Sequence, residues 1–301
     1  MIESRSEMLS LAPDGSWLRN KRHWQPREPF YAVIGDSELS ATLTTTYRAG
    51  LGDRALAATI LPAQVESGQL GRLKRSRAAC QLAGIHVVGA LQEEVFSLCD
   101  SRTDTARETG IANVVRIQDE LWIGHDIESG SIQAVLTQAW PGEVAPVQGE
   151  VLGAGGSARA AVWALVQWGV HSLTIRDHSS SGQQRVQSWL SRTEWKQRGF
   201  ELRVTSLPKV PEQQAEPRPT VWIACLPGDM DVLPFLPVTK GQGNGMLLDL
   251  RFSPTQEGLG TPAGIRWVGL EPVLLMQCGL SFAWWFGLPV PWQVMRKALI
   301  R

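Results

Sequence analysis

The segment Val151-Leu152-Gly153-Ala154-Gly155-Gly156-Ser157-Ala158-Arg159-Ala160 decides the fold that we expect of this chain. An apolar run within 147–152 is typical of a buried strand, and an amphipathic helix is expected over 157–168, where Gly169 ends it. A second strand at 172–175 completes a strand–helix–strand unit. In this context, Gly-x-Gly-x-x-Ala predicts a dinucleotide-binding turn.

Each small residue of this turn has a physical role in binding a dinucleotide. Gly153 permits the tight turn, Gly155 lets a pyrophosphate approach the backbone, and Ala158 lets the helix pack closely on the strand. The N–H groups of the first helical turn, around Gly156 and Ser157, carry a partial positive charge that favours phosphates. The alternative is a glycine-rich turn that serves only packing.

Asp177 stands at the end of the second strand of this unit. At this offset a carboxylate accepts hydrogen bonds from a ribose diol, and it would repel a 2′-phosphate. Asp177 therefore favours NAD over NADP. The alternative is that Asp177 caps the adjoining loop, and the neighbouring Arg176 and His178 leave NADP open.

The rest of the chain alternates strand and helix patterns, which favours an α/β layer structure with a parallel sheet. Residues 1–28 are polar and Arg-rich, and we interpret them as an extension. We expect strands at 30–35, 56–61, 85–88, 200–205, 220–225 and 246–250, helices over 69–83 and 93–99, and a surface loop over 206–219.

Composition excludes several classes of protein. The 301 residues suffice for two domains, and a formal net charge of zero argues against a nucleic-acid-binding protein. The four cysteines are far apart with no histidine at ligand spacing, so we expect free thiols and no metal site. An apolar run of about 18 residues, as a membrane span needs, is missing, and so is a signal peptide. We expect a cytoplasmic protein.

Four motifs, in the same order, resemble those of the shikimate and quinate dehydrogenase family. The glycine segment resembles the family's Gly-Ala-Gly-Gly-Ala-x-Arg-Ala cofactor loop, and Tyr31–Asp36 is similar to its opening strand. Asp249–Pro254 resembles its Asp-x-x-Tyr-x-Pro segment. The C-terminal Gln-x4-Phe-x2-Trp-x-Gly spacing is reproduced by Gln277, Phe282, Trp285 and Gly287.

This resemblance implies an N-terminal α/β substrate domain and a C-terminal Rossmann dinucleotide-binding domain, with the C-terminal helix returning to the first domain. We expect the substrate domain to comprise residues 29–130 and 272–301, and the Rossmann domain residues 131–271. The implied activity is the NAD(P)-dependent interconversion of 3-dehydroshikimate and shikimate, or of a related cyclic polyol acid, in aromatic amino acid biosynthesis.

Such a reaction needs a group that exchanges a proton, because hydride transfer to a ketone leaves an alkoxide. The resemblance places the family's Lys at Gln92, within His86–Gln92, and a Gln amide delivers no proton at neutral pH. By ungapped count from Gly124, Glu128 stands at the position of the family's Asp. We expect Glu128 and Gln92 to form the reactive pair, and His125 is the alternative proton carrier.

The resemblance also implies residues that hold the substrate. Ser40 and Thr42 best match the family's Ser-x-Ser, which binds the ring carboxylate. Asn113 and Gln277 match residues that contact the ring hydroxyls. Gly228 matches a glycine in the turn beside the nicotinamide.

Several family residues are replaced, so two hypotheses stand side by side. The family's Pro is Ala90 here, and its Tyr is Phe252. In the first hypothesis the protein is an active oxidoreductase on a modified cyclic polyol acid. In the second it is a catalytically inactive dinucleotide- or polyol-binding scaffold, and structural use of the cofactor is a third reading. The polyol and the oligomeric state do not follow from the sequence.

Overall fold

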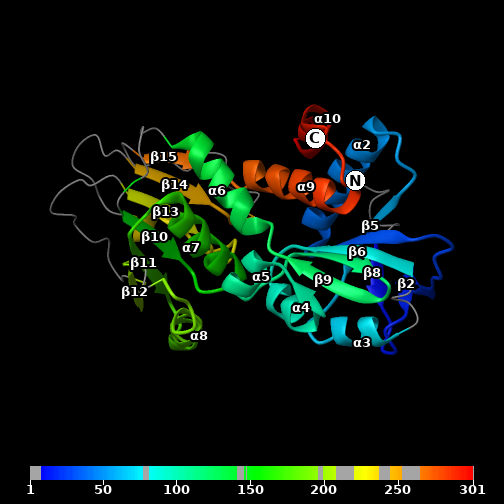
Figure 1. The fold of residues 1–301 in the computed structure, drawn as a ribbon, viewed down its shortest axis with the longest axis horizontal. Helices are drawn as coiled ribbons and strands as arrows, with labels where there is room; N and C mark the ends of the chain where they lie inside the picture. Colours follow the sequence, from blue (N-terminus) through cyan, green and yellow to red (C-terminus); the bar gives the residue numbers. More distant parts are fainter. Residues whose placement is uncertain are drawn as a thin grey trace. The chain divides into compact units, whose positions relative to one another are not determined.

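The chain forms two compact units, residues 1–128 with 274–301 and residues 129–273. The structure is a computed structural model, drawn in Figure 1, that describes residues 8–76, 81–140, 146, 148–195, 199–207, 220–236, 245–252 and 265–300. The sequence placed the corresponding boundaries at 130 and 271, two residues from these divisions.

The second unit is built on a parallel sheet. Its described elements are α6 (Glu128–Ala139), β10 (Gln148–Leu152), α7 (Gly156–Trp168), β11 (Ser172–Asp177), α8 (Ser180–Leu190), β12 (Glu201–Ser206), β13 (Thr220–Ala224), the 3-10 helix η2 (Leu233–Phe235), β14 (Gly245–Asp249) and β15 (Ile265–Val268). In the described residues the strand order is β12-β11-β10-β13-β14-β15, all parallel. Counted from β10, this is the 3-2-1-4-5-6 order of the Rossmann fold, so the expected fold is confirmed.

Burial explains why this sheet is parallel. Every residue of β13 and β14 is buried, so the strands are apolar on both faces, as in sheets covered by helices on both sides. Helix α7 packs against β10 (Figure 1). It ends at Gly169, whose φ of 99° lies in the left-handed region that glycine adopts without strain.

The first unit has a mixed sheet. Its described elements are β1 (Leu9–Leu11), β2 (Trp17–Arg19), β3 (Arg22–His23), β4 (Phe30–Ile34), α2 (Ser37–Asp53), β5 (Thr59–Gln64), α3 (Leu70–Arg75), β6 (Leu82–Val87), α4 (Gln92–Leu98), β7 (Ser101–Arg102), α5 (Asp104–Thr109), β8 (Val114–Gln118), β9 (Leu121–His125), α9 (Glu271–Phe286) and α10 (Trp292–Leu299). The strand order is β3-β2-β1-β5-β4-β6-β8-β9-β7 in the described part of the chain.

The expectation of a parallel sheet is wrong for part of this unit. Strand β4 pairs in parallel with β5 and β6, as the strand–helix alternation predicted. However, β8 pairs antiparallel with both β6 and β9. The β8–β9 hairpin turns through Asp119 and Glu120, whose φ values are 50° and 64°, and neither residue is the glycine that marks such a turn in a sequence. Residues 77–80 of the helix expected over 69–83, and most of the 206–219 loop, lie outside the described residues.

The N-terminal segment contributes to the sheet and the core. Strand β1 pairs in parallel with β5 and antiparallel with β2, so residues 9–23 are more than the extension that we expected. Trp17 is fully buried and lies edge-on to Phe30, with 5.7 Å between the ring centroids. Burying a side chain of this size contributes about 2–3 kcal/mol to folding.

Helices cover both faces of the first unit's sheet (Figure 1). Helices α2, α9 and α10 lie on one face, and α3 and α4 lie on the other. Trp285 of α9 donates from its indole N–H to the carbonyl of Val115 on β8, at 3.0 Å. Gly84 makes this approach possible, because a Cβ there would lie 2.9 Å from the indole nitrogen and 2.8 Å from the same carbonyl. The returning C-terminal helix is thus anchored on the sheet.

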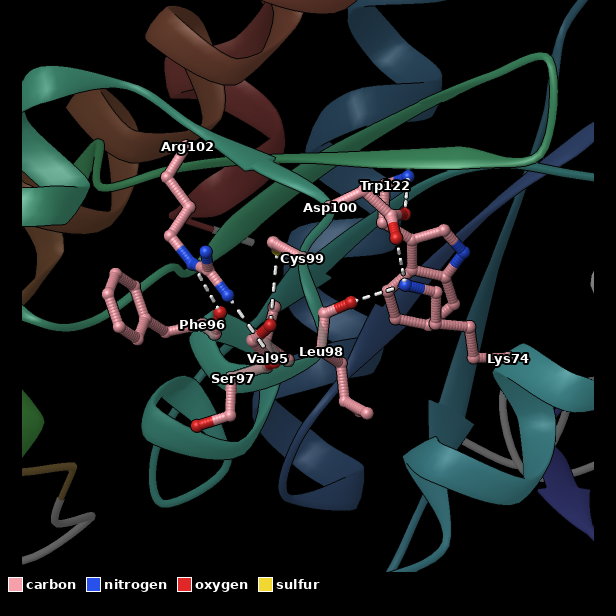
Figure 2. A network of polar contacts seen from close by, with 9 residues as sticks. All are labelled: Lys74, Val95, Phe96, Ser97, Leu98, Cys99, Asp100, Arg102 and Trp122. Carbon is pink, nitrogen blue, oxygen red and sulfur yellow. Dashed lines mark hydrogen bonds and ion pairs between the residues drawn. The ribbon is translucent and has the colours of Figure 1, made fainter.

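Two cationic side chains satisfy the last carbonyl groups of α4 (Figure 2). Arg102 donates from Nε to the carbonyl of Phe96 at 2.7 Å, and Lys74 of α3 donates from Nζ to that of Leu98 at 2.5 Å. Asp100 accepts from Lys74 at 2.8 Å and from the backbone N–H of Trp122 at 2.7 Å. Cations at a helix C-terminus also interact favourably with the helix dipole. The network therefore ties α3, α4 and β9 together.

We expect Asp100→Ala to lower the free energy of unfolding by about 1–2 kcal/mol at pH 7, since it removes both hydrogen bonds of the carboxylate. Asp100→Asn should cost less, because the amide oxygen can still accept from Trp122. The hydrogen bond and charge of Lys74 hold the pKa of Asp100 below its ordinary 3.8. The Asp100 carboxylate therefore stabilises the fold at neutral pH. This stabilisation is lost as the pH falls from 3.8 through the lowered pKa of the folded protein.

Urea unfolding of the wild type and both variants at pH 7 and pH 3.5 measures these differences. We expect the difference in free energy of unfolding between wild type and Asp100→Asn to be smaller at pH 3.5 than at pH 7. An equal difference at both pH values would contradict a role of the carboxylate charge.

Candidate functional site

Gln92 and Glu128 lie together in the first unit, as the sequence predicted for the reactive pair. Gln92 is the first residue of α4 and Glu128 the first of α6, and both side chains are buried. Gln92 Nε2 donates to Glu128 Oε2 at 2.6 Å. The backbone N–H of Ala112, just before β8, donates to the Gln92 carbonyl at 3.2 Å. This hydrogen bond fixes the start of α4 beside the start of β8. The catalytic role of the pair stays a prediction.

Asn113 lies beside this pair and orients the chain that leads to Glu128. Its Oδ1 accepts from the backbone N–H of Ile127 at 2.8 Å. The side chain is fully buried, and Nδ2 has no hydrogen-bond partner among the described residues. The same holds for Oε1 of Gln92. A buried polar group without a partner is costly, so these two atoms indicate a place for a polar ligand.

Gln277, the predicted C-terminal contact, lies on α9 and is buried. It is close to His86 of β6, a fully buried residue that the sequence analysis gave no role. His86 Nδ1 lies 2.8 Å from the hydroxyl of Tyr47 on α2. Burial lowers the pKa of His86 to about 4, and a side-chain hydrogen bond with Gln277 acts in the opposite direction, so the imidazole is neutral at pH 7.

His125, the alternative proton carrier, is held in a separate set of contacts. Its Nδ1 lies 2.9 Å from the hydroxyl of Thr103, and its ring lies 5.3 Å from that of Trp284 between centroids. Burial lowers the pKa of His125 to about 4. A neutral histidine with this pKa is a poor proton donor at pH 7, which weakens the alternative.

The positions of Ser40 and Thr42 argue against a shared role in binding one carboxylate. Both lie in α2, two residues apart, so their side chains point about 160° apart around the helix axis. The Thr42 hydroxyl donates to the Glu38 carbonyl at 3.0 Å, and that of Ser40 points to the Ser37 carbonyl at 3.4 Å. Ser37 is exposed at the start of the helix, on the same side as Ser40.

The glycine turn of the second unit has the geometry of a phosphate-binding loop. Gly153 has a φ of 116°, and a Cβ there would lie 2.5 Å from the Cys225 carbonyl. Gly155 is the exposed N-cap of α7, and a Cβ on it would meet nothing within 4 Å among the described residues. In the described structure no side chain caps α7, so the N–H groups of Gly156 and Ser157 remain for a ligand. These features fit the pyrophosphate of a dinucleotide.

Gly228 lies in the loop after β13, next to β10 in the sheet. It is packed so closely on the carbonyl of Phe252 that a Cβ would not fit. The loop is also held by Arg251, which donates to the Met230 carbonyl and forms two hydrogen bonds, of 2.8 and 2.7 Å, with the carboxylate of Asp249. Ser253 and Pro254, the end of the matched motif, lie outside the described residues. The carboxyl ends of β10 and β13 are where ligands bind in this fold.

Asp177 binds the loop that follows its strand, which was the alternative to its role in ribose binding. Its Oδ1 accepts from the backbone N–H and the hydroxyl of Ser179, at 2.8 and 2.7 Å. Ser179 is the N-cap of α8. The neighbouring Arg176 donates from Nε to Glu150 at 3.0 Å. The structure therefore gives Asp177 a local structural role that does not depend on any cofactor.

The described residues contain no cluster of three or more His, Cys, Asp or Glu side chains that would hold a metal ion. Cys99 and Cys278 are buried free thiols, and Cys80 lies outside the described residues. In the part of the chain that the structure describes, no helix has the length and apolar character that crossing a bilayer requires.

Comparison with known proteins gives a consistent result. The chain is 26% identical to shikimate dehydrogenase (NADP(+)) of Anaeromyxobacter dehalogenans, over 91% of this chain and 96% of that protein. The structure of shikimate dehydrogenase from Aquifex aeolicus matches 92% of this chain and all of that one, with a TM-score of 0.75 and 21% identity. The ligand-free 5-ketofructose reductase of Gluconobacter sp. strain CHM43 matches 91% of this chain and 98% of that one, with a TM-score of 0.73 and 19% identity. No family model matches the chain.

Fold and site define a two-domain α/β protein whose second domain is of the Rossmann type and carries a glycine turn that fits a dinucleotide. Among such proteins, the chain is similar over nearly its whole length to shikimate dehydrogenases, at low sequence identity. The resemblance that its four motifs predicted is thereby confirmed.

We expect Gly153→Ala to lower the free energy of unfolding by about 1–3 kcal/mol, because the added methyl group is strained and meets the Cys225 carbonyl. Gly155→Ala should change stability by less than about 0.5 kcal/mol, but it should weaken the binding of NADH and NADPH. Thermal unfolding and fluorescence titration measure the two effects. Unchanged dinucleotide affinity in Gly155→Ala would leave the turn with a packing role only.

Proposed function

We propose that the protein is an NAD(P)-dependent oxidoreductase that interconverts a ring ketone and an alcohol on shikimate or a related cyclic polyol acid. The observation that carries the proposal is the buried hydrogen bond of 2.6 Å between Gln92 and Glu128. It places a carboxylate, which can exchange a proton, beside an amide, which can orient a substrate oxygen. The named relative supports this substrate, since it is a shikimate dehydrogenase.

The two residues of the pair have different capacities. A bound nicotinamide supplies or accepts the hydride, so the protein has to supply or accept the proton of the alcohol oxygen. Gln92 donates hydrogen bonds but cannot release a proton at neutral pH. Glu128 is the member of the pair that titrates, and its contact with Gln92 fixes the position of its carboxylate. In the direction of oxidation, Glu128 would take the hydroxyl proton while Gln92 holds the oxygen.

The cofactor belongs at the glycine turn, with Gly153, Gly155, Gly156 and Ser157 around the pyrophosphate and Gly228 in the adjacent loop. A preference for NAD through Asp177 is not supported. The Asp177 carboxylate already accepts two hydrogen bonds from Ser179, the N-cap of α8, and the named relative is a shikimate dehydrogenase (NADP(+)). We therefore assign the site to a nicotinamide dinucleotide, and we do not expect Asp177 to select against the 2′-phosphate of NADP.

The substrate class follows from atoms that still need partners. Nδ2 of Asn113 is a donor and Oε1 of Gln92 is an acceptor, and both are buried without a partner among the described residues. Hydroxyl groups both donate and accept, so a ring polyol can satisfy the two atoms at once. A reductase of a sugar ketone shares this fold, which makes a polyol other than shikimate the natural second substrate to test.

If Glu128 exchanges the proton, Glu128→Gln should reduce kcat for shikimate oxidation by at least about a hundredfold, since the amide keeps the shape but cannot titrate. Dinucleotide affinity should stay within about twofold, because the glycine turn is unchanged. The matched control is His125→Ala, which should keep most of the activity. Full activity in Glu128→Gln together with loss in His125→Ala would assign the proton to the histidine.

Gln92→Lys should raise kcat, since an ammonium group can both donate a proton and pair with the Glu128 carboxylate. We expect a gain of about tenfold or more, with Gln92→Met as the control of similar length and no polar group. Steady-state kinetics with shikimate and each cofactor measures it. If the wild type and Gln92→Lys turn over no cyclic polyol acid although both bind dinucleotide, the inactive-scaffold hypothesis replaces this proposal.

A further inference from the structure

Arg251 is a buried cation of the second unit whose partners belong to two different segments of the chain. It lies just after β14, and only 5% of it is exposed. Its Nε and Nη2 donate to the two carboxylate oxygens of Asp249, at 2.8 and 2.7 Å. Its Nη1 donates to the carbonyl of Met230, in the loop after β13. A guanidinium can make these three contacts at once because its donors stand in a rigid planar fork.

The loop from Cys225 to Met230, called the β13 loop below, is held at its start, middle and end. At its start, the N–H of Cys225 donates to the carbonyl of the last residue of β10 at 2.7 Å. In its middle, Gly228 packs directly on the carbonyl of Phe252. At its end, the carbonyl of Met230 accepts from Arg251. The two residues that follow Leu250 therefore fix the middle and the end of the β13 loop beside the end of β14.

The order of the strands decides which half of a dinucleotide faces the β13 loop. In a Rossmann unit the pyrophosphate lies at the turn after the first strand, here β10, and the adenosine ribose lies at the end of the second strand, here β11. Among the described residues β10 has β11 on one side and β13, followed by β14, on the other (Figure 1). A dinucleotide that crosses the carboxyl ends of these strands therefore has its nicotinamide half over β13 and β14. The β13 loop and Arg251 follow these two strands.

We propose that Arg251 is a positioning residue for the nicotinamide half of the cofactor. Fixed by Asp249, its guanidinium sets the position of the Met230 carbonyl and thereby the position of the β13 loop. The inference rests on the proposed function for the identity of the cofactor. It adds that the two halves of the cofactor depend on different residues: the glycine turn binds the pyrophosphate, and Arg251 acts on the nicotinamide half alone. A change at Arg251 is then felt only by ligands that carry a nicotinamide.

Titration calorimetry on the full chain tests this with NADPH and with 2′-phospho-ADP-ribose, which lacks the nicotinamide. Arg251→Lys keeps a positive charge beside Asp249, but an ammonium cannot replace the planar fork that also reaches Met230. In this variant the Kd of NADPH should rise about tenfold or more, while the Kd of 2′-phospho-ADP-ribose should stay within about twofold of wild type. NADH and ADP-ribose form a second pair of probes. The matched control is Arg203→Lys on β12, whose ion pair with Glu201 is exposed, and it should change neither Kd.

A second variant keeps the test valid if Arg251→Lys does not fold. Asp249→Asn combined with Arg251→Met leaves no buried charge without its partner, and the Asn oxygen can still accept from the backbone N–H of residue 251, as Asp249 Oδ1 does at 3.1 Å. It should weaken NADPH binding and spare 2′-phospho-ADP-ribose in the same way.

An equal change in Kd for NADPH and 2′-phospho-ADP-ribose would show a structural role only, and an unchanged Kd for NADPH in both variants would also overturn the inference. A wild type that binds no dinucleotide overturns it together with the proposed cofactor. A wild type that binds NADPH but oxidises no cyclic polyol acid refutes the proposed reaction, and the comparison of the two ligands then still decides the role of Arg251.

Discussion

The structure of the first unit depends on the hydrogen bond between the Trp285 indole and the Val115 carbonyl. An indole N–H buried without a partner would be costly, and this contact satisfies it on the sheet itself. Gly84 is required because any larger residue would fill the space between the two groups. Around this point, Trp285 packs on Tyr31 and Tyr47, with ring centroids 4.8 and 5.3 Å apart. The contact therefore sets the positions of α9 and α2, from which Gln277 and Tyr47 reach the site.

The parts of the fold that follow local rules were predictable from the sequence. The β10–α7–β11 unit was predicted because glycines mark the turns before and after α7 in the sequence. Gly153 and Gly169 stand at these turns and adopt backbone conformations that favour glycine. The β2–β3 and β8–β9 hairpins were missed because their turns place Asn20-Lys21 and Asp119-Glu120 at positive φ, where Asn-Gly or Asp-Gly is the usual signal. The β8–β9 hairpin is also held by the pairing of β8 with β6, which lies further away in the sequence and which a local pattern does not contain.

The same distinction applies to the candidate site. Gln92 and Glu128 were found because each stands at a fixed distance from a motif, and the structure brings them to 2.6 Å. Ser40 and Thr42 were chosen by matching residue types, which disregards the direction of side chains around a helix. Tyr47 and His86 could not be paired from the sequence, since 39 residues separate them and their contact exists only once α2 lies on the sheet.

The return of α9 to the first unit also constrains the order in which the protein folds during synthesis. Residues 129–273 form a continuous segment, so this unit can acquire all of its contacts as soon as it leaves the ribosome. The first unit begins earlier but lacks its final layer until residues 274–301 are made. Until then, Tyr31 and Tyr47 lack the Trp285 ring that packs on them in the complete unit. The part of the chain that is translated first is therefore completed last.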